Sequence, residues 1–251
     1  MLELIQPDWP AHSRIRSVST TRNGGVSKAP YDGLNLGDHV GDLEQAVHSN
    51  RRLVAEACNL PRGPAWLEQV HGTDIADAAT VTESCQADGA FTDKPGTVCV
   101  IMTADCLPVL LCNRSGTKVA AVHAGWRGLL NGVIEQAVDR FNEPVDELLV
   151  WLGPAIGSRA FEVGDEVRTE FVQSDEEAIT AFENNRPGHW LADIYQLARV
   201  RLQKRGIRSI YGGGECTYTD AGRFFSYRRD GVTGRMATLI WIDPENPKNY
   251  L

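Results

Sequence analysis

The chain has 251 residues, enough to bury a sizeable core as one large domain or two small ones. Hydrophobic residues make up 42% and charged residues 23%, as in ordinary globular proteins. The formal net charge of −8 argues against a general nucleic-acid binder, which needs a basic face to replace phosphate counterions. A local arginine cluster can still bind a small anion, because a local field can oppose the global charge.

The N-terminal residues and the cysteines indicate the cellular compartment. The segment MLELIQPDWP is acidic and interrupted by proline, unlike a secretory signal, and no apolar run reaches the roughly 20 residues of a membrane span. The six cysteines lack CxxC pairs, a pattern that fits reduced thiols better than disulfides. Cys99 and Cys112 lie in or beside apolar runs and are expected to be inert. We therefore expect a cytoplasmic protein without membrane partners.

Hydrophobic periodicity and capping signals predict helices alternating irregularly with short buried strands. In chain order these are a helix from Asp42 to about Cys58, strands Thr97–Met102, Val109–Cys112 and Lys118–His123, a helix Leu129–Phe141, a strand Leu148–Leu152, a helix from an Asp193 N-cap to a Gly206 stop, and a strand Arg235–Ile242. No GxGxxG follows the first strand, so a Rossmann domain is disfavoured. The pattern predicts an α+β fold, a single compact domain over 1–251 with mixed sheets and helices packed outside.

Three segments carry metal-ligand residues where strands are expected to end. These residues are His71, Cys106 and His123, and the last two flank a predicted strand–turn–strand unit that would bring them side by side. One cysteine and two histidines suit zinc or copper, and three protein ligands leave a coordination position open. A metal in such a site lowers the pKa of bound water toward about 7. Spacing alone leaves ordinary packing roles open, because the chain lacks the H-x-E and P-C-x-x-C signature of base deaminases.

Eight sequence blocks in fixed order resemble the YfiH-type, laccase-domain family, over nearly the whole chain. They are STTRNGGVS (19–27), LNLG (34–37), LEQVHG (67–72), TADCLP (103–108), HAGWRG (123–128), LGPAIG (152–157), CTY (216–218) and FSYRRD (225–230). Members of this family are described as purine nucleoside phosphorylases and deaminases, and earlier as polyphenol oxidases. The resemblance implies zinc ligation by His71, Cys106 and His123. It also implies a fold of stacked layers similar to bacterial toxin deamidases with a Cys–His pair.

Phosphorolysis requires a phosphate site, and arginine is the natural bidentate partner for phosphate. The candidates are Arg22, Arg51, Arg127 and Arg228. Arg127 stands at a predicted helix start, where backbone amides also favour an anion. Each of the four can equally be a solvated surface arginine.

Three further residues are candidates for the reaction site. Asn35 is expected to hydrogen-bond a ribose hydroxyl or a base edge, or else to stabilise a turn. Asp105 is a candidate catalytic residue that orients a metal ligand or moves a proton, or else a capping carboxylate at a strand end. Tyr227 is expected to stack on a purine, unless it packs in the core.

The predicted function is zinc-dependent phosphorolysis of adenosine, inosine or methylthioadenosine, together with deamination of adenosine. Its partners would be a purine nucleoside and inorganic phosphate. A copper polyphenol oxidase is a rival, although three ligands and only six histidines cannot build a multi-copper cluster. A metal-free Cys106–His123 hydrolase acting on an amide or ester, such as a cell-wall precursor, is a second rival. A structural zinc module is a third, but such sites normally close with a fourth protein ligand.

Overall fold

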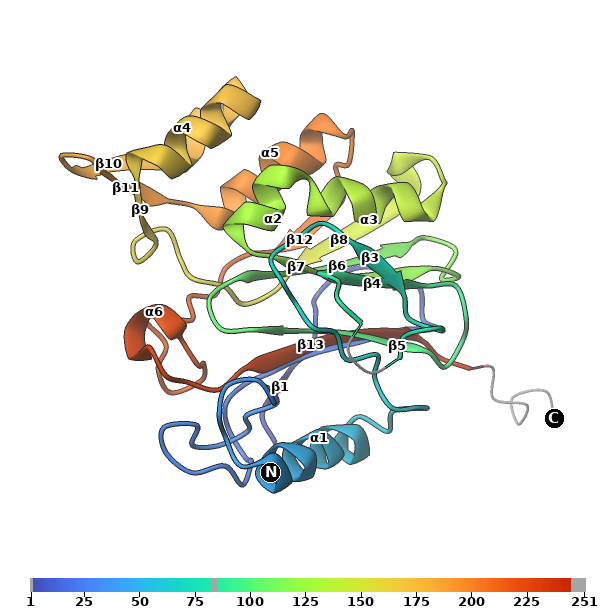
Figure 1. Cartoon of the computed structure of the whole chain (residues 1–251). Helices are drawn as coiled ribbons and strands as arrows, with labels where there is room; N and C mark the ends of the chain where they lie inside the picture. Colours follow the sequence, from blue (N-terminus) through green and yellow to red (C-terminus); the bar gives the residue numbers. More distant parts are fainter. Residues whose placement is uncertain (1, 83–84, 245–251) are drawn as a thin grey trace.

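The computed structural model describes residues 2–82 and 85–244. Two β-sheets lie face to face at the centre, and helices cover their outer faces (Figure 1). One outer layer is α1 (Glu44–Ala57), and the opposite layer contains α2 (Trp126–Asn131), α3 (Val133–Phe141) and α5 (Ile194–Lys204). Mixed sheets with helices outside confirm the predicted α+β class.

The four-stranded sheet joins the two ends of the chain. Its order is β1 (Leu4–Ile5), β2 (Ile15–Thr20), β13 (Met236–Ile242) and β5 (Val98–Thr103), all antiparallel. All residues of β5 and β13 are buried, because one face of this sheet contacts α1 and the other contacts the second sheet. The strands predicted in 97–102 and 235–242 are therefore confirmed, to within a residue at each end.

The six-stranded sheet carries the centre of the core. Its order is β12 (Ile210–Gly212), β8 (Leu148–Leu152), β6 (Leu107–Asn113), β7 (Val119–Ala124), β4 (Gly89–Thr92) and β3 (Ile75–Asp77). The two outer pairs are parallel and the inner pairs antiparallel, so the sheet is mixed. Strands β6, β7 and β8 are buried throughout, which confirms the strands predicted in 109–112, 118–123 and 148–152.

The helices beside this sheet follow the predicted apolar stripe. Along α3 the buried residues are Val133, Ile134, Ala137, Val138 and Phe141. The predicted N-cap of α5 is confirmed, because the Asp193 carboxylate accepts a hydrogen bond from the Gln196 amide at 3.0 Å. Among the described residues, no helix is long and apolar enough to cross a bilayer.

A smaller antiparallel sheet and short helices complete the fold. The sheet order is β10 (Phe182–Arg186), β11 (His189–Ala192) and β9 (Glu162–Gly164), and it adjoins α4 (Asp165–Ser174). The remaining elements are η1 (Val145–Glu147), η2 (Glu176–Ala181) and α6 (Tyr227–Asp230). Sequence reasoning missed this sheet, because its strands are short and β10 is mostly exposed and polar.

Two predicted helix boundaries are wrong. The expected helix 129–141 is two helices, because Gly132 adopts a left-handed conformation (φ 96°) between α2 and α3, and α2 already begins at Trp126. The first helix begins at Glu44 rather than Asp42. The Asp42 carboxylate instead accepts hydrogen bonds from Ser27 and Asn35, and so braces the preceding loop.

Candidate metal centre and adjoining pocket

Strand pairing brings Cys106 and His123 together. Cys106 ends the short connection from β5 to β6, in which Asp105 adopts a positive φ of 87°. His123 lies in β7, opposite Pro108 of β6, and Leu107 pairs with Ala124. The β6–β7 register therefore fixes the spacing of the cysteine and this histidine, as the sequence pattern predicted.

His71 reaches the same point from a loop held by Asp88. The Asp88 carboxylate is fully buried and accepts three backbone N–H bonds, from Val70 at 3.1 Å, His71 at 2.9 Å and Gly72 at 2.6 Å. Its Oδ1 also lies 2.7 Å from Nδ1 of His123. These bonds hold His71 at a positive φ of 59° and orient the ring of His123.

The three side chains form a compact donor group. One donor atom from each of His71, Cys106 and His123 lies within 4.8 Å of the others, and Cys106 Sγ is 3.9 Å from His71 Nε2. Ligand atoms around a tetrahedral zinc ion lie about 3.3–3.6 Å apart, so small side-chain movements suffice to close this group on a metal. Gly125 leaves room for it, because a Cβ there would lie 2.7 Å from the His71 ring and 3.3 Å from Cys106 Sγ.

The electrostatics favour a thiolate. Burial alone would raise the pKa of Cys106, but the neighbouring His123 and His71 outweigh it and lower that pKa to about 6. Burial opposes the charge on His123, yet the Cys106 thiolate and Asp88 raise its pKa to about 9. Burial also opposes the charge on Asp88, but the bonds from His123 and the 70–72 loop hold its pKa below the usual value. By contrast, burial raises the pKa of Cys99 and Cys112, which are fully buried packing residues as predicted.

A pocket of about 170 Å³ opens beside Cys106. Its walls are largely apolar and come from the β5–β6 connection, α2, the loop before β9 and α5. The apolar residues are Ala104, Trp126, Ile156, Phe161 and Ile194. Three of the predicted site residues, Asp105, Tyr227 and Arg228, complete the lining. Tyr227 is 62% exposed, so its ring is available to a ligand rather than packed in the core.

Asp105 supports this pocket rather than a histidine of the donor group. Its Oδ1 accepts from Thr217 Oγ1 at 2.6 Å, and its Oδ2 accepts from Ser226 Oγ at 3.0 Å and from the Arg228 amide at 2.7 Å. Orientation of a histidine, one of its two predicted roles, belongs to Asp88. Sequence reasoning missed Asp88, because it stands in no motif and becomes significant only when β4 pairs with β7.

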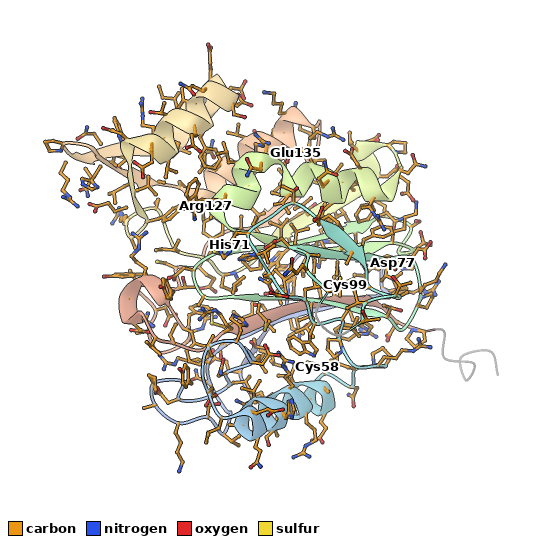
Figure 2. The ribbon with its side chains drawn as sticks, viewed as in Figure 1. Cys58, His71, Asp77, Cys99, Arg127 and Glu135 are labelled. Carbon is orange, nitrogen blue, oxygen red and sulfur yellow. The ribbon has the colours of Figure 1, made fainter. Side chains whose placement is uncertain are left out.

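Of the remaining predicted residues, none lines this pocket. Asn35 is fully buried, and its amide group binds Gly37, Asp42 and the Arg235 backbone N–H. It therefore holds a loop, and the predicted contact with a ribose is not supported. Arg127 is exposed, with its guanidinium 4.3 Å from the ring of Trp126, and Figure 2 shows it above His71 in that view.

Two predicted arginines have partners within the protein. Arg22 pairs with Asp32 at 3.1 Å and lies over the ring of Phe225. Arg51 pairs with Asp38 at 3.1 Å. Both guanidiniums are therefore largely committed to holding the loops around them.

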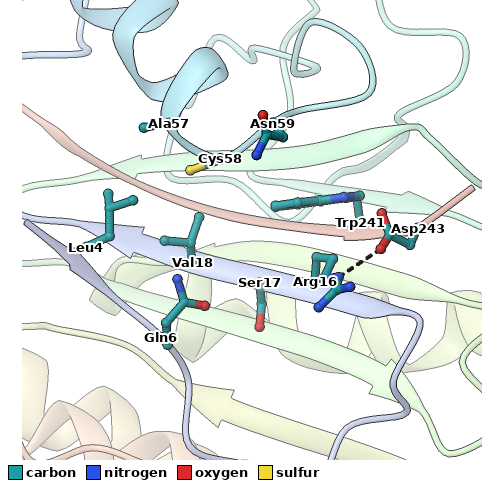
Figure 3. Close-up of a pocket in the computed structure, with 10 residues that line it drawn as sticks. All are labelled: Leu4, Gln6, Arg16, Ser17, Val18, Ala57, Cys58, Asn59, Trp241 and Asp243. Carbon is teal, nitrogen blue, oxygen red and sulfur yellow. Dashed lines mark hydrogen bonds and ion pairs between the residues drawn. The ribbon is translucent and has the colours of Figure 1, made fainter. Parts of the chain in front are cut away.

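A separate pocket of about 360 Å³ lies between the four-stranded sheet and the end of α1 (Figure 3). It contains the Arg16–Asp243 ion pair, with 2.8 Å between Nε and Oδ2, beside Trp241 and Cys58. None of the predicted site residues lines it. Burial raises the pKa of the Cys58 thiol, so its environment does not favour the reactive thiolate.

The fold and the site define an α+β protein with a Cys–His–His centre at the end of a buried hairpin, next to an apolar pocket. The chain belongs to the family described as "Multi-copper polyphenol oxidoreductase laccase", whose model matches residues 16–243. The predicted YfiH-type, laccase-domain resemblance is thereby confirmed.

Relatives and solved structures agree with this assignment. The purine nucleoside phosphorylase PA4543 of Pseudomonas aeruginosa is 55% identical, over 95% of this chain and 98% of its own. The purine nucleoside phosphorylase YfiH of Escherichia coli is 54% identical, over 96% of this chain and all of its own. The crystal structure of the Neisseria meningitidis protein NMB0706 has a TM-score of 0.93 and 48% identity, covering 96% of this chain and 99% of that one.

Proposed function

We propose that this chain is a zinc-dependent purine nucleoside phosphorylase of the cytoplasm, acting on adenosine, inosine or methylthioadenosine, and that it also deaminates adenosine. The observation that carries the proposal is an apolar pocket that opens directly onto the cysteine of a Cys–His–His donor group. The names of relatives more than 50% identical over nearly the whole chain support the phosphorylase activity.

The donor chemistry fits zinc. His71, Cys106 and His123 would hold the ion, and Asp88 would keep Nδ1 of His123 engaged so that Nε2 faces the metal. When bound in such an open site, zinc supplies a Lewis acid that lowers the pKa of water and polarises a substrate atom. A multi-copper centre is disfavoured, because the described residues contain this donor group alone as a candidate.

The pocket residues would bind and orient the nucleoside. The flat apolar faces of Trp126 and Phe161 suit a purine, and the exposed ring of Tyr227 would stack on it. Asp105 would hold Arg228 and Tyr227 in position through its bond to the Arg228 amide. The apolar walls of the pocket would exclude water from the base. Hydrogen bonds made inside the pocket would then be stronger than the same bonds in water.

A second function is favoured by one observation. Cys106, His123 and Asp88 are arranged as a nucleophile, a base and an orienting carboxylate, with 2.7 Å between Asp88 and His123. This arrangement suits a thiol hydrolase acting on an amide or ester without metal.

Metal analysis combined with a nucleoside panel tests the proposal. Protein purified without added metal should contain about one zinc per chain, and should convert nucleosides to base and ribose 1-phosphate only when phosphate is present. If the protein instead contained about one copper per chain and oxidised phenols, both the zinc site and the nucleoside chemistry would be refuted. Amide or ester turnover by metal-free protein would establish the hydrolase instead.

A further inference from the structure

Arg235, just before β13, carries a guanidinium with an open binding edge. Its Nη1 donates to the carbonyl oxygens of Thr233 at 2.9 Å and Gly234 at 3.0 Å. Among the described residues, Nε and Nη2 have no hydrogen-bond partner, and no carboxylate pairs with this guanidinium at 4.0 Å or less. Arg235 is half-buried, and this burial lowers the pKa of its guanidinium. A planar Nε/Nη2 edge is the geometry that binds two oxygens of one phosphate.

The guanidinium lies toward the candidate site and is held there. Its guanidinium carbon lies 6.0 Å from the centre of the ring of Tyr227, which lines the pocket beside Cys106. Its side chain packs on Gly37, where a Cβ would lie 2.8 Å from Arg235 Cγ. The open edge is therefore positioned before any ligand arrives, which reduces the entropy that binding must overcome.

Arg51, by contrast, is already neutralised. Arg51 pairs with Asp38 at 3.1 Å, donates to the Leu36 carbonyl at 3.0 Å and lies 3.9 Å over the ring of Trp66. Burial lowers the pKa of His39, and the charge of Arg235 lowers it further. Unlike Arg51, Arg235 has no carboxylate counterion among the described residues. Arg228, which lines the pocket, also lacks a carboxylate partner there, and its Nη1 donates to the Glu162 carbonyl at 2.9 Å.

We propose that the Nε/Nη2 edge of Arg235 binds the phosphate co-substrate beside the Cys–His–His centre. This inference rests on the proposed phosphorolysis. In that reaction a phosphate oxygen forms the bond to C1′, the C1′–N9 bond breaks, and the electron pair stays on the purine nitrogen. The proton of hydrogen phosphate passes to the departing base, so the charges balance. Arg235 is then a substrate-binding residue that sequence reasoning did not single out.

Substitution of Arg235 tests the assignment through the phosphate dependence of the rate. In Arg235→Gln the KM for phosphate should rise about tenfold or more, while the KM for the nucleoside changes less than about twofold and the zinc content stays the same. Arg235→Lys keeps the charge and the packing on Gly37 but loses the bidentate edge, so an intermediate KM is expected. An unchanged phosphate KM in both variants would overturn the proposal.

The matched control is Arg16→Gln. This variant also removes one arginine, but from the far end of β13. Arg16 lies opposite Trp241 in the sheet, and Trp241 is five residues, or about 17 Å, along β13 from Met236, the neighbour of Arg235. The phosphate KM of this variant should equal that of the parent protein. An equal rise in both variants would show a general charge effect and contradict a specific site.

Binding of inorganic phosphate to the zinc-loaded protein separates this inference from the proposed function. Phosphate should raise the unfolding temperature of the parent protein and not that of Arg235→Gln. If phosphate stabilises the parent protein only, and neither protein turns over nucleosides, the phosphorylase activity is refuted but the phosphate site at Arg235 is supported. Turnover with equal phosphate stabilisation in both proteins would refute the site alone. If Arg235→Gln abolishes the stabilisation by adenosine 5′-monophosphate but not the stabilisation by inorganic phosphate, the edge binds a nucleotide phosphate and the proposal is wrong.

Discussion

Replacing Asp88 with asparagine tests how the 70–72 loop and His123 are held together. Each carboxylate oxygen accepts two donors, with Oδ1 bonded to the His71 amide and His123 Nδ1, and Oδ2 bonded to the amides of Val70 and Gly72. In Asp88→Asn an NH₂ group replaces one oxygen. At the Oδ2 position it faces two backbone donors, and at the Oδ1 position it faces the His71 amide, while the neutral ring of His123 can accept from it through Nδ1.

The cost follows from at least one unsatisfied backbone donor. At about 1–3 kcal/mol for each unsatisfied buried donor, the metal-free variant should lose at least about 1–3 kcal/mol of unfolding free energy. For a chain of this size the unfolding temperature should fall by at least about 2 °C. Zinc affinity should fall about 10- to 100-fold, because the ring of His123 is no longer held.

Thermal unfolding and competitive zinc titration measure both effects. The control is Asp93→Asn, at a surface carboxylate that pairs with Lys94 at 2.9 Å and lies away from the donor group. The control should match the parent protein in stability and in zinc affinity. Parent-like values for Asp88→Asn would refute the conclusion that this carboxylate organises the site.

Three further results are expected. Gly125→Ala should weaken zinc binding about tenfold or more while the protein stays folded, because the new Cβ would lie 2.7 Å from the ring of His71; parent-like affinity would contradict this. Zinc binding near neutral pH should release one proton from the Cys106–His123 pair, because the pKa is about 6 for Cys106 and about 9 for His123. This proton release should decline above about pH 9, and calorimetry in buffers of different ionisation enthalpy measures it. Asp105→Asn should raise the KM for nucleoside while zinc stoichiometry stays at one; a large loss of kcat at unchanged KM would instead show that Asp105 transfers a proton in the reaction.

Residues with strong local signals could be predicted from the sequence. The central strands are continuous apolar runs, and the candidate ligand residues stand where those runs end, so β6, β7, Cys106 and His123 were predicted together. The Asp193 cap was predicted for the same reason, since capping depends on neighbours in the chain.

Features that depend on distant pairing could not be predicted in this way. Asp88 is an isolated acidic residue until β4 pairs with β7 and brings it beside His123. Arg235 resembles any arginine before a strand until Gly37 and Tyr227 fix its direction. The break at Gly132 was missed because the apolar stripe continues across it, while the backbone reverses its φ at that residue.

Titration of metal-free protein with zinc, followed by phosphorolysis of a purine nucleoside, tests the central claim most directly. Activity should be absent without metal and should rise linearly to a plateau at one zinc per chain. The Cys106→Ser and His71→Ala variants should show no such plateau, because each removes one of the three donors. Full nucleoside turnover by verified metal-free protein would contradict the account, and would assign the chemistry to the Cys106 thiolate and His123.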